Sequence, residues 1–183
     1  MELQKAIESR RSIRRYDPDR PVEEEKLRAL LESARLCQSA HNRQPWRFMV
    51  LKGEKKDQIA GLLVRWLEEN PQLPDWLKAV RHSAEVICQA PVLILVFREH
   101  DPDWEGSDLL SVGAAIEHIC LTAVELGLGS VWLRDPVFVE EEIAALVGWP
   151  LQLVSAVSVG YPAEDPGPRP RLPLDKLMLE PEG

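Results

Sequence analysis

Four arginines crowd into six residues near the start of the chain, in the segment Arg10-Arg11-Ser12-Ile13-Arg14-Arg15. The chain of 183 residues has a formal net charge of -8, so this cluster opposes the overall charge balance. Two further arginines, Arg169 and Arg171, lie near the other end in the segment Pro-Arg-Pro-Arg-Leu-Pro. Guanidinium groups bind phosphate oxygens through paired hydrogen bonds, and the Ser12 hydroxyl adds a donor. The pattern predicts a site for a small anion, and a phosphate monoester fits it best.

The surroundings of this cluster allow other interpretations. Residues 2–9 predict a short helix that ends at the arginines, and a helix dipole favours cations at its C-terminal end. That effect accounts for one or two arginines but not for four. If the helix continued, Arg10 and Arg14 would share a face and repel each other unless an anion lay between them. A solvated cluster of surface charges is the alternative to an anion site.

A polar loop is the second candidate for chemistry. The segment Ser39-Ala40-His41-Asn42-Arg43-Gln44-Pro45-Trp46 is dense in amides and hydroxyls and precedes a predicted strand. The side-chain amides of Asn42 and Gln44 can each donate and accept hydrogen bonds. Recognition of the edge of a heteroaromatic ring requires both abilities. An ordinary polar loop with an Asn turn is the alternative.

The composition argues against several classes of partner. A net charge of -8 is unlike the basic face of a nucleic-acid-binding protein and disfavours docking on anionic membranes. Residues 1–5 lack the apolar segment of a signal peptide, and the longest apolar run, residues 91–97, is too short to cross a membrane. Three scattered cysteines without a CxxC pair are typical of a reducing compartment. We therefore expect a cytoplasmic protein that binds neither nucleic acid nor membrane.

No motif predicts a metal site or an activated nucleophile. His118 and Cys120 lie in an apolar segment with no second pair at metal-ligand spacing, so we expect both in the core. Cys37 adjoins the polar loop, where it is either a reactive thiol or, more commonly, a small buried hydrophobe. The segment Gly127-Leu128-Gly129-Ser130 begins like a dinucleotide fingerprint, but Trp132 stands at the third glycine position.

The elements that must position these residues alternate irregularly between helices and strands. Apolar residues recur at helical spacing in five segments after the arginine cluster, which are residues 21–36, 54–69, 75–89, 108–126 and 140–147. Shorter apolar segments predict strands over residues 47–52, 91–97, 130–133 and 151–159. The irregular order, without regular βαβ alternation, predicts one α+β domain over residues 1–183, built around a small sheet.

Two of the predicted strands carry more information. Residues 91–97 are apolar without interruption, which predicts a strand buried on both faces. Alternation over residues 151–159 predicts one strongly apolar face, made of Leu151, Leu153, Val157 and Val159. Val154 and Ser155 interrupt that alternation.

Proline dominates the segment after the last predicted strand. Five of the twelve residues from 162 to 173 are proline, and such a segment continues neither a sheet nor a helix. Apolar residues return next, namely Leu172, Leu174, Leu177, Met178 and Leu179. We expect residues 161–183 to form an extended arm that lies on another surface, with Arg169 and Arg171 pointing to one side of it.

Four segments, in this order along the chain, resemble the nitroreductase family of flavoproteins. Arg10–Arg14 resembles the N-terminal phosphate motif of the family, and Ser39–Phe48 resembles its PSxxNxQPWxF block. Gly113–Trp132 resembles its long central helix followed by LGLGSVW, and Gly160–Pro173 resembles its C-terminal VGYP…(K/R)xRxP block. The resemblance covers nearly the whole chain.

The resemblance implies a nitroreductase-like α+β fold, with a small, mostly antiparallel sheet flanked by helices. It implies an FMN-binding homodimer with two sites at the subunit interface and a C-terminal arm that extends onto the partner subunit. Ten residues would bind FMN, namely Arg10, Arg11, Ser12, Arg14, Ser39, Asn42, Gln44, Leu133, Arg169 and Arg171. The arginines and Ser12 would hold the phosphate and ribityl end, Ser39 would come from the other subunit, and Leu133 would approach the ring through backbone groups.

The activity implied by the resemblance is an FMN-dependent oxidoreductase without a catalytic side chain or a metal. It would relay hydride from NADH or NADPH to a nitroaromatic, a quinone or a similar small acceptor by a ping-pong mechanism. Two alternatives remain open, a flavin-binding protein without reductase turnover and a relative that acts on flavin or on a halogenated or heterocyclic substrate. Gln38 replaces a proline frequent in the family, and Arg134-Asp135 replaces a small or acidic pair, so the sequence leaves the substrate class open.

Overall fold

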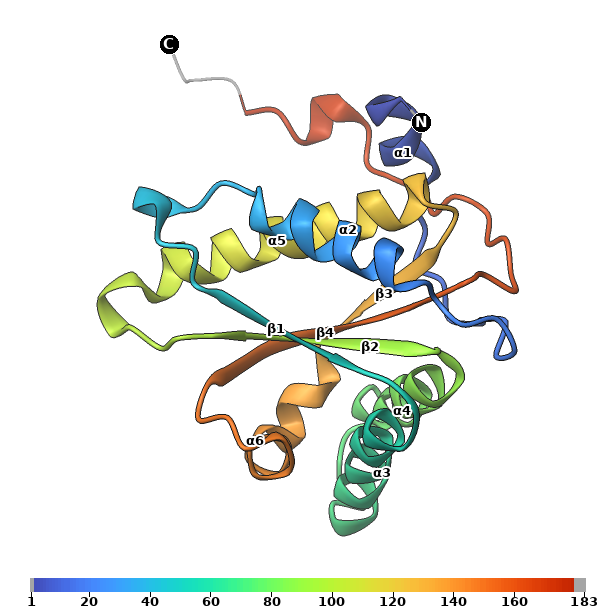
Figure 1. Cartoon of the computed structure of the whole chain (residues 1–183), viewed down its shortest axis with the longest axis vertical. Coiled ribbons are helices and arrows are strands. Elements are labelled where there is room, and N and C mark those ends of the chain that lie inside the picture. The colour runs from blue at the N-terminus through green and yellow to red at the C-terminus, as the bar shows by residue number, and fades with distance from the viewer. Residues whose placement is uncertain (1, 180–183) are drawn as a thin grey trace.

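A four-stranded antiparallel sheet forms the centre of the molecule. The structure is a computed structural model and describes residues 2–179. The strands are β1 (Trp46–Leu51), β2 (Val92–Arg98), β3 (Gly129–Leu133) and β4 (Gln152–Gly160), and their order in the sheet is β1-β2-β4-β3 (Figure 1). Every pairing is antiparallel. The α+β class and the antiparallel sheet expected from the sequence are confirmed.

Helices cover both faces of this sheet and enclose two apolar cores. One face carries α2 (Glu24–Arg35) and α5 (Glu105–Glu125), as Figure 1 shows above the strands. The other face carries α3 (Gly53–Glu69), α4 (Val80–Gln89) and α6 (Glu140–Val147). The short helix α1 (Leu3–Ser9) packs against α5. The sheet is thus the middle layer of three.

Burial of the strands follows their place between the layers. All seven residues of β2 are buried, as the uninterrupted apolar run predicted. The prediction for the last strand was wrong in one respect, because a register shift in the pairing of β2 with β4 skips Val154. This β-bulge moves the residues before it to the opposite face. Leu153 therefore packs in the core below the sheet, whereas Val157 and Val159 pack in the core under α2 and α5.

Three helix starts differ from the predictions by three residues or more, and one is that of α2, which was expected from residue 21 and begins at Glu24. The helix expected from residue 75 begins at Val80, after a 3-10 turn over Leu77–Ala79. The helix expected from residue 108 begins at Glu105, three residues earlier than predicted. The other end of α5 agrees with the prediction, because Gly127 follows it with a φ of 72°. That left-handed conformation is easily adopted by glycine alone.

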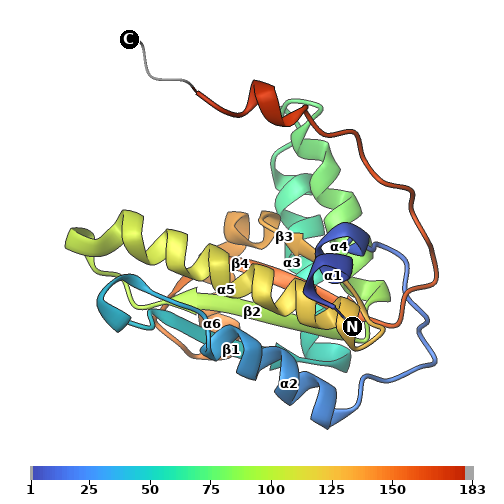
Figure 2. The same ribbon diagram turned by 90° about the horizontal axis from the view of Figure 1, so that it is seen from above.

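The two ends of the chain run beside each other along β3. The Ile13 N–H donates to the Ser130 carbonyl at 2.9 Å, and the Ala163 N–H donates to the Arg15 carbonyl at 2.9 Å. A side chain at Gly129 would lie 2.8 Å from Ile13, so this close approach requires glycine. Figure 2 shows the segment after α1 and the segment after β4 on the same side of the molecule, running in opposite directions.

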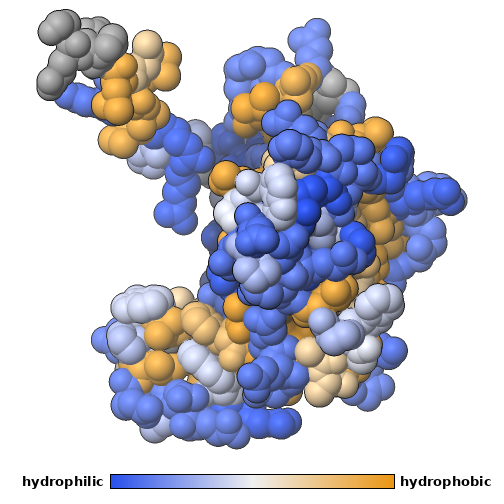
Figure 3. Space-filling view, turned by 90° about the vertical axis from the view of Figure 1, so that its left-hand side faces the viewer, coloured by the Kyte–Doolittle hydropathy of each residue, from blue (hydrophilic) through white to orange (hydrophobic). Residues whose placement is uncertain are grey.

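Apolar side chains remain exposed on α5 and on the arm. Leu110 on α5 is 78% exposed, and Leu174 and Leu179 in the arm are 71% and 96% exposed. Figures 1 and 2 show the arm standing off from the layered body, and Figure 3 shows its apolar residues in orange. By length and composition residues 102–125 would suffice to cross a membrane, but the helix they contain packs on the sheet as a core element.

Candidate functional site

The arginine cluster and the tail arginines meet in one small cavity of about 140 Å³. We call it the arginine cavity, and it is lined by Arg10, Arg11, Ser12, Arg14, Pro166, Gly167, Arg169 and Arg171. All lining residues come from the two terminal segments, which lie side by side. Six of the ten residues expected to bind a cofactor are therefore brought together here.

The backbone explains why Arg10, Ser12 and Arg14 face this cavity. The helix does not continue through the arginines. It ends at Ser9, and the backbone is already extended at Arg10, where ψ is 126°. The segment instead bridges β3, with Ser12 beside Ser130. Extended side chains alternate, so Arg10, Ser12 and Arg14 share one side while Ile13 is buried on the other. The repulsion that a continued helix would cause between Arg10 and Arg14 therefore does not arise, although the same residues still converge.

The helix dipole accounts for one of the arginines. The Arg11 Nη1 donates to the carbonyl oxygens of Glu8 and Arg10, at 2.7 and 2.8 Å. It therefore satisfies carbonyl groups at the C-terminal end of α1, where a cation is favoured. Arg11 lines the cavity and also stabilises the helix end.

The cavity has the donor set of a phosphate site. Five guanidinium groups line it, and within residues 2–179 only Arg10 among them forms an ion pair with a carboxylate, Glu117, at 3.3 Å. Glu164 stands nearby, but its Oε1 accepts from the Arg14 and Arg15 backbone N–H groups, at 2.5 and 3.2 Å. These two hydrogen bonds hold the arm against the arginine segment. Guanidinium and hydroxyl groups supply donors and positive charge, which is what a phosphate group requires.

The polar loop over residues 39–46, which we call the amide loop, has a tight, internally hydrogen-bonded structure. The Gln44 N–H donates to Ser39 Oγ at 3.0 Å, and Gln44 Nε2 donates to the Asn42 carbonyl and side-chain oxygens, both at 3.2 Å. His41, Asn42 and Gln44 have φ values of 50°, 55° and 50°. Such left-handed conformations cost roughly 1–2 kcal/mol each in non-glycine residues, so other contacts must hold the loop in this shape.

Most of those contacts come from Arg43, which the sequence did not single out, and the Ala40 N–H adds a hydrogen bond to Ser111 Oγ of α5 at 3.4 Å. Its Nε and Nη2 donate to the two carboxylate oxygens of Asp108 at 3.0 and 3.2 Å, and its Nη2 donates to Asp101 at 2.9 Å. The guanidinium carbon lies 4.7 Å from the centroid of the Trp104 ring, which His41 also contacts edge-on. The hydrogen bond with Asp108 is the main cause that raises the pKa of Arg43. Nothing in the sequence indicated this pairing, because Asp101 and Asp108 lie 58 and 65 positions from Arg43.

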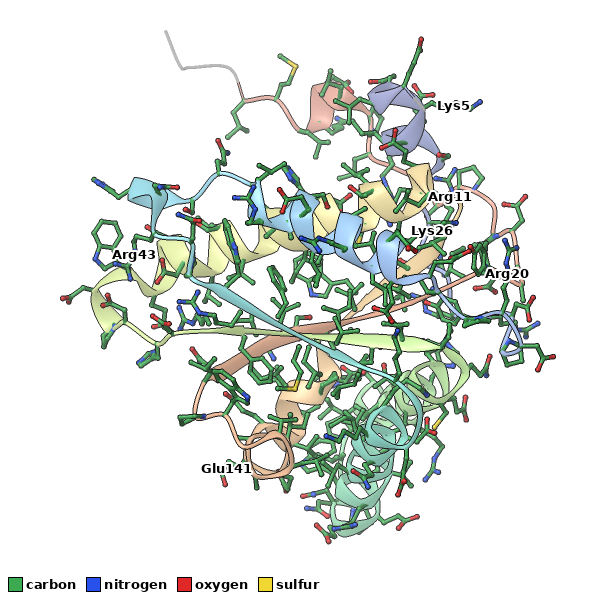
Figure 4. All side chains as sticks on the ribbon, in the orientation of Figure 1. Lys5, Arg11, Arg20, Lys26, Arg43 and Glu141 are labelled. Atoms are coloured by element: carbon green, nitrogen blue, oxygen red, sulfur yellow. The ribbon has the colours of Figure 1, made fainter. Side chains whose placement is uncertain are left out.

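The loop and the arginine cavity lie at different places along α5. The loop contacts the helix at Asp108, whereas the cavity contacts it at Glu117. Nine residues of helix separate these positions by about 14 Å. Figure 4 shows Arg43 and Arg11 at opposite ends of the layer formed by α2 and α5. Ser39, Asn42 and Gln44 therefore do not line the arginine cavity of their own chain.

Leu133 is also apart from the cavity. It is buried at the end of β3, and its carbonyl oxygen accepts from Ser155 Oγ at 2.7 Å. The next residues turn away from the strand, where Asp135 accepts from Ser83 Oγ at 2.6 Å. One of the two acceptor positions of the Leu133 carbonyl is thus in use.

The remaining candidates carry no site. His118 is exposed, with Nδ1 3.1 Å from the Ser33 carbonyl oxygen, so its predicted core position was wrong. Cys120 is buried as predicted, and burial raises its pKa to about 11. Cys37 is buried, and burial raises its pKa too, which disfavours the reactive thiolate. Among residues 2–179, no three His, Cys, Asp or Glu side chains are grouped to hold a metal ion.

Comparison with known proteins agrees with the resemblance. Residues 7–161 match the Nitroreductase family. The chain is 32% identical to an NADH dehydrogenase of Thermus thermophilus, covering 98% of this chain and 96% of that protein. It is 31% identical to an iodotyrosine deiodinase of Thermotoga neapolitana, covering 93% and 92%.

A solved structure extends this comparison to the fold. A protein from Desulfovibrio desulfuricans, described as a nitroreductase in complex with FMN, is 30% identical and superposes with a TM-score of 0.77. The match covers 100% of this chain and 98% of that one. Sequence and fold agree over nearly the full length, and the chain therefore belongs to the nitroreductase family.

Proposed function

We propose that this chain relays hydride from NADH or NADPH to a small acceptor, with the phosphate of FMN held in the arginine cavity. As a nitroreductase family member, it is an FMN-dependent NAD(P)H oxidoreductase. The single observation that carries the proposal is the arginine cavity, because both ends of the chain are held together to build it. We take residues 1–183 as one FMN-binding unit.

Each residue of the cavity has a separate part in this proposal. Arg14, Arg169 and Arg171 offer guanidinium groups that pair with no carboxylate within residues 2–179, so they hold the phosphate. Arg10 shares its charge between Glu117 and the phosphate. Ser12 donates its hydroxyl to the phosphate and ribityl end, and Arg11 adds charge while it stabilises α1.

A second copy of the chain would complete the site. The amide loop lies about 14 Å along α5 from the cavity, so a ring bound at one cavity would meet Ser39, Asn42 and Gln44 of the partner chain. The exposed apolar residues of α5 and of the arm support this homodimer, since a monomer rarely leaves so much apolar surface uncovered. The arm would lie on the partner, and Leu133 would face the ring through its backbone.

When bound, FMN would supply the redox chemistry, which is the transfer of hydride from NADH or NADPH to a nitroaromatic, a quinone or a similar acceptor. The protein binds the phosphate, orients the ring through the amides of Asn42 and Gln44, and admits the two substrates in turn. This alternation is a ping-pong mechanism. No side chain is assigned as an acid or a base.

An anaerobic titration tests the proposal. Purified protein is loaded with FMN, and its absorbance is followed as NADH or NADPH is added. We expect one equivalent of at least one nucleotide to bleach the bound flavin, and an added quinone or nitroaromatic to restore it. Protein that stays colourless after incubation with FMN would contradict the proposal. A yellow protein that neither nucleotide bleaches would instead support flavin binding without turnover.

Reductive dehalogenation is a second candidate function. The 31% identity to an iodotyrosine deiodinase, over more than nine tenths of both chains, favours it. Product analysis after anaerobic turnover with a halogenated phenol would separate the candidates. Release of halide at a rate close to that of quinone reduction would support dehalogenation, and unchanged halophenol would exclude it.

A further inference from the structure

Arg43 occupies the middle of the amide loop but does not share the role expected of its neighbours. Asn42 and Gln44 are exposed, whereas the Arg43 guanidinium faces the first turns of α5 and the short segment before it. Figure 4 shows Arg43 at the end of the molecule where the loop meets α5. Arg43 therefore joins the loop to a rigid helix.

The partner of Arg43 is a fully buried carboxylate. The Asp108 side chain is 0% exposed, and both of its oxygens accept from Arg43. A buried carboxylate requires such a partner, because an unpaired charge in this position would be strongly unfavourable. The paired geometry also fixes the plane of the guanidinium group, which a single contact would leave free to rotate. Trp104 lies against the same guanidinium and restricts it further.

The backbone on either side of Arg43 depends on this attachment. Arg43 has an ordinary φ of -68°, whereas the residues on both sides, Asn42 and Gln44, have φ values of 55° and 50°. These angles determine the direction in which the two amide side chains leave the loop. Because non-glycine residues avoid this region, the chain would relax to other angles if the contacts of Arg43 were loosened.

We infer that Arg43 and Asp108 are positioning residues, which hold the Asn42 and Gln44 amides in the direction that the flavin ring requires. The inference rests on the proposed function, since it assumes that these amides meet the ring. Neither Arg43 nor Asp108 contacts the phosphate site, so their effect reaches the cofactor through the loop alone. A contact that merely stabilised α5 would alter protein stability but not the behaviour of the flavin.

The substitution Arg43→Lys separates these two roles, because lysine keeps the positive charge beside Asp108 but cannot form the paired contact. The matched control is Arg35→Lys, which alters an equally paired but exposed contact between Arg35 and Glu32 on α2. For each FMN-loaded protein, we would measure the rate of flavin reduction by NADH or NADPH, the absorbance spectrum of bound FMN, the FMN dissociation constant and the melting temperature.

We expect Arg43→Lys to slow flavin reduction by about 10- to 100-fold, the scale of a small misplacement at a reacting centre. The spectrum of bound FMN should shift, whereas the dissociation constant should stay within about threefold, because the arginine cavity still holds the phosphate. Arg35→Lys should leave all four quantities near wild type. The second variant, Asp108→Asn, keeps the shape of the side chain without its charge, and it should slow reduction in the same way.

Reduction rates within twofold of wild type in both variants would overturn the inference, whatever their melting temperatures. Equal losses of rate and of FMN affinity would also overturn it, because the pair would then act on binding as a whole. If wild-type protein binds FMN but neither nucleotide reduces it, the proposed function fails separately. In that case a shifted spectrum in the variants supports the positioning role, and an unchanged spectrum contradicts it.

Discussion

The arginine cavity and the amide loop differ in how their charges are matched. Five guanidinium groups line the cavity, and within residues 2–179 one of them, Arg10, pairs with a carboxylate. In the loop a single guanidinium, that of Arg43, pairs with both Asp108 and Asp101. The cavity therefore has positive charge available for an anion from solution, whereas the loop uses its charges to maintain its own shape.

This difference indicates that the cavity and the loop have separate roles in the proposed site. The cavity would supply most of the binding energy through the phosphate, and the loop would supply orientation. Changes in the cavity should mainly alter FMN affinity, while changes around Arg43 should mainly alter reactivity. The following predictions test the cavity side of this comparison, from the largest expected effect to the smallest.

Removing both tail arginines should have the largest effect. We expect Arg169→Ala combined with Arg171→Ala to weaken FMN binding by about 3–6 kcal/mol, since hydrogen bonds to charged groups contribute about 1.5–3 kcal/mol each. Both side chains are exposed in the free chain, so the melting temperature of the FMN-free protein should hardly change. Fluorescence titration with FMN measures the affinity. Wild-type affinity in the double variant would place the phosphate elsewhere.

A single change at Arg10 should have a smaller effect. Arg10→Ala should weaken FMN binding by about 1.5–3 kcal/mol, toward the lower end because Glu117 already shares the charge of Arg10. Glu117→Gln serves as the control, because it releases Arg10 from its ion pair. Calorimetric titration should show FMN affinity equal to or above wild type for Glu117→Gln. Affinity tenfold below wild type in that control would show that the pair positions Arg10.

The packing that aligns the arginine segment can be tested at Gly129. A Cβ at this position would lie 2.8 Å from three atoms of Ile13, so Gly129→Ala should lower the free energy of unfolding by about 1–3 kcal/mol. FMN affinity should fall as well, because the arginine segment must move. Gly61→Ala is the matched control in α3, where a Cβ meets nothing within 4 Å, and it should stabilise the protein slightly. Chemical denaturation measures the free energy of unfolding of both variants. If Gly129→Ala were as stable as Gly61→Ala, the close approach of Ile13 to Gly129 would be contradicted.

The smallest effect concerns Cys120 of α5, whose thiol interacts with the side chain of Ser130. Its thiol has a pKa raised from 9.0 to about 11, mainly by burial, so the folded state favours the neutral thiol. The stability that the protein gains with this thiol neutral is fully present below pH 9. It is lost progressively as the pH rises through 11, because the unfolded chain releases the proton more readily. At pH 10 we expect a loss of about 1 kcal/mol relative to pH 8, which Cys120→Ala should remove from the pH profile. Identical profiles for wild type and variant would contradict the raised pKa.

The sequence predicted local structure better than contacts between distant segments. Apolar periodicity identified all four strands and the main helices, because each pattern is contained within one element. The bulge at Val154 was not predictable, since it depends on how β4 pairs with β2. The path of the arginine segment after α1 depends on its contact with β3, where Ile13 packs against Gly129, more than a hundred residues away.

The same limit applies to the candidate site. The motifs identified the arginines of the cavity and the amides of the loop. They gave no sign that Arg43, although it lies inside the Ser39–Phe48 block, pairs with Asp108, because the two residues lie 65 positions apart. They also did not reveal that the cavity and the loop of one chain are separated along α5.

The measurement that tests the central claim most directly compares the affinity of the wild-type protein for FMN and for riboflavin, which lacks the phosphate. If the arginine cavity holds the phosphate, FMN should bind at least about 100-fold more tightly, and the difference should shrink as salt concentration rises. Equal affinity for the two flavins would contradict the account.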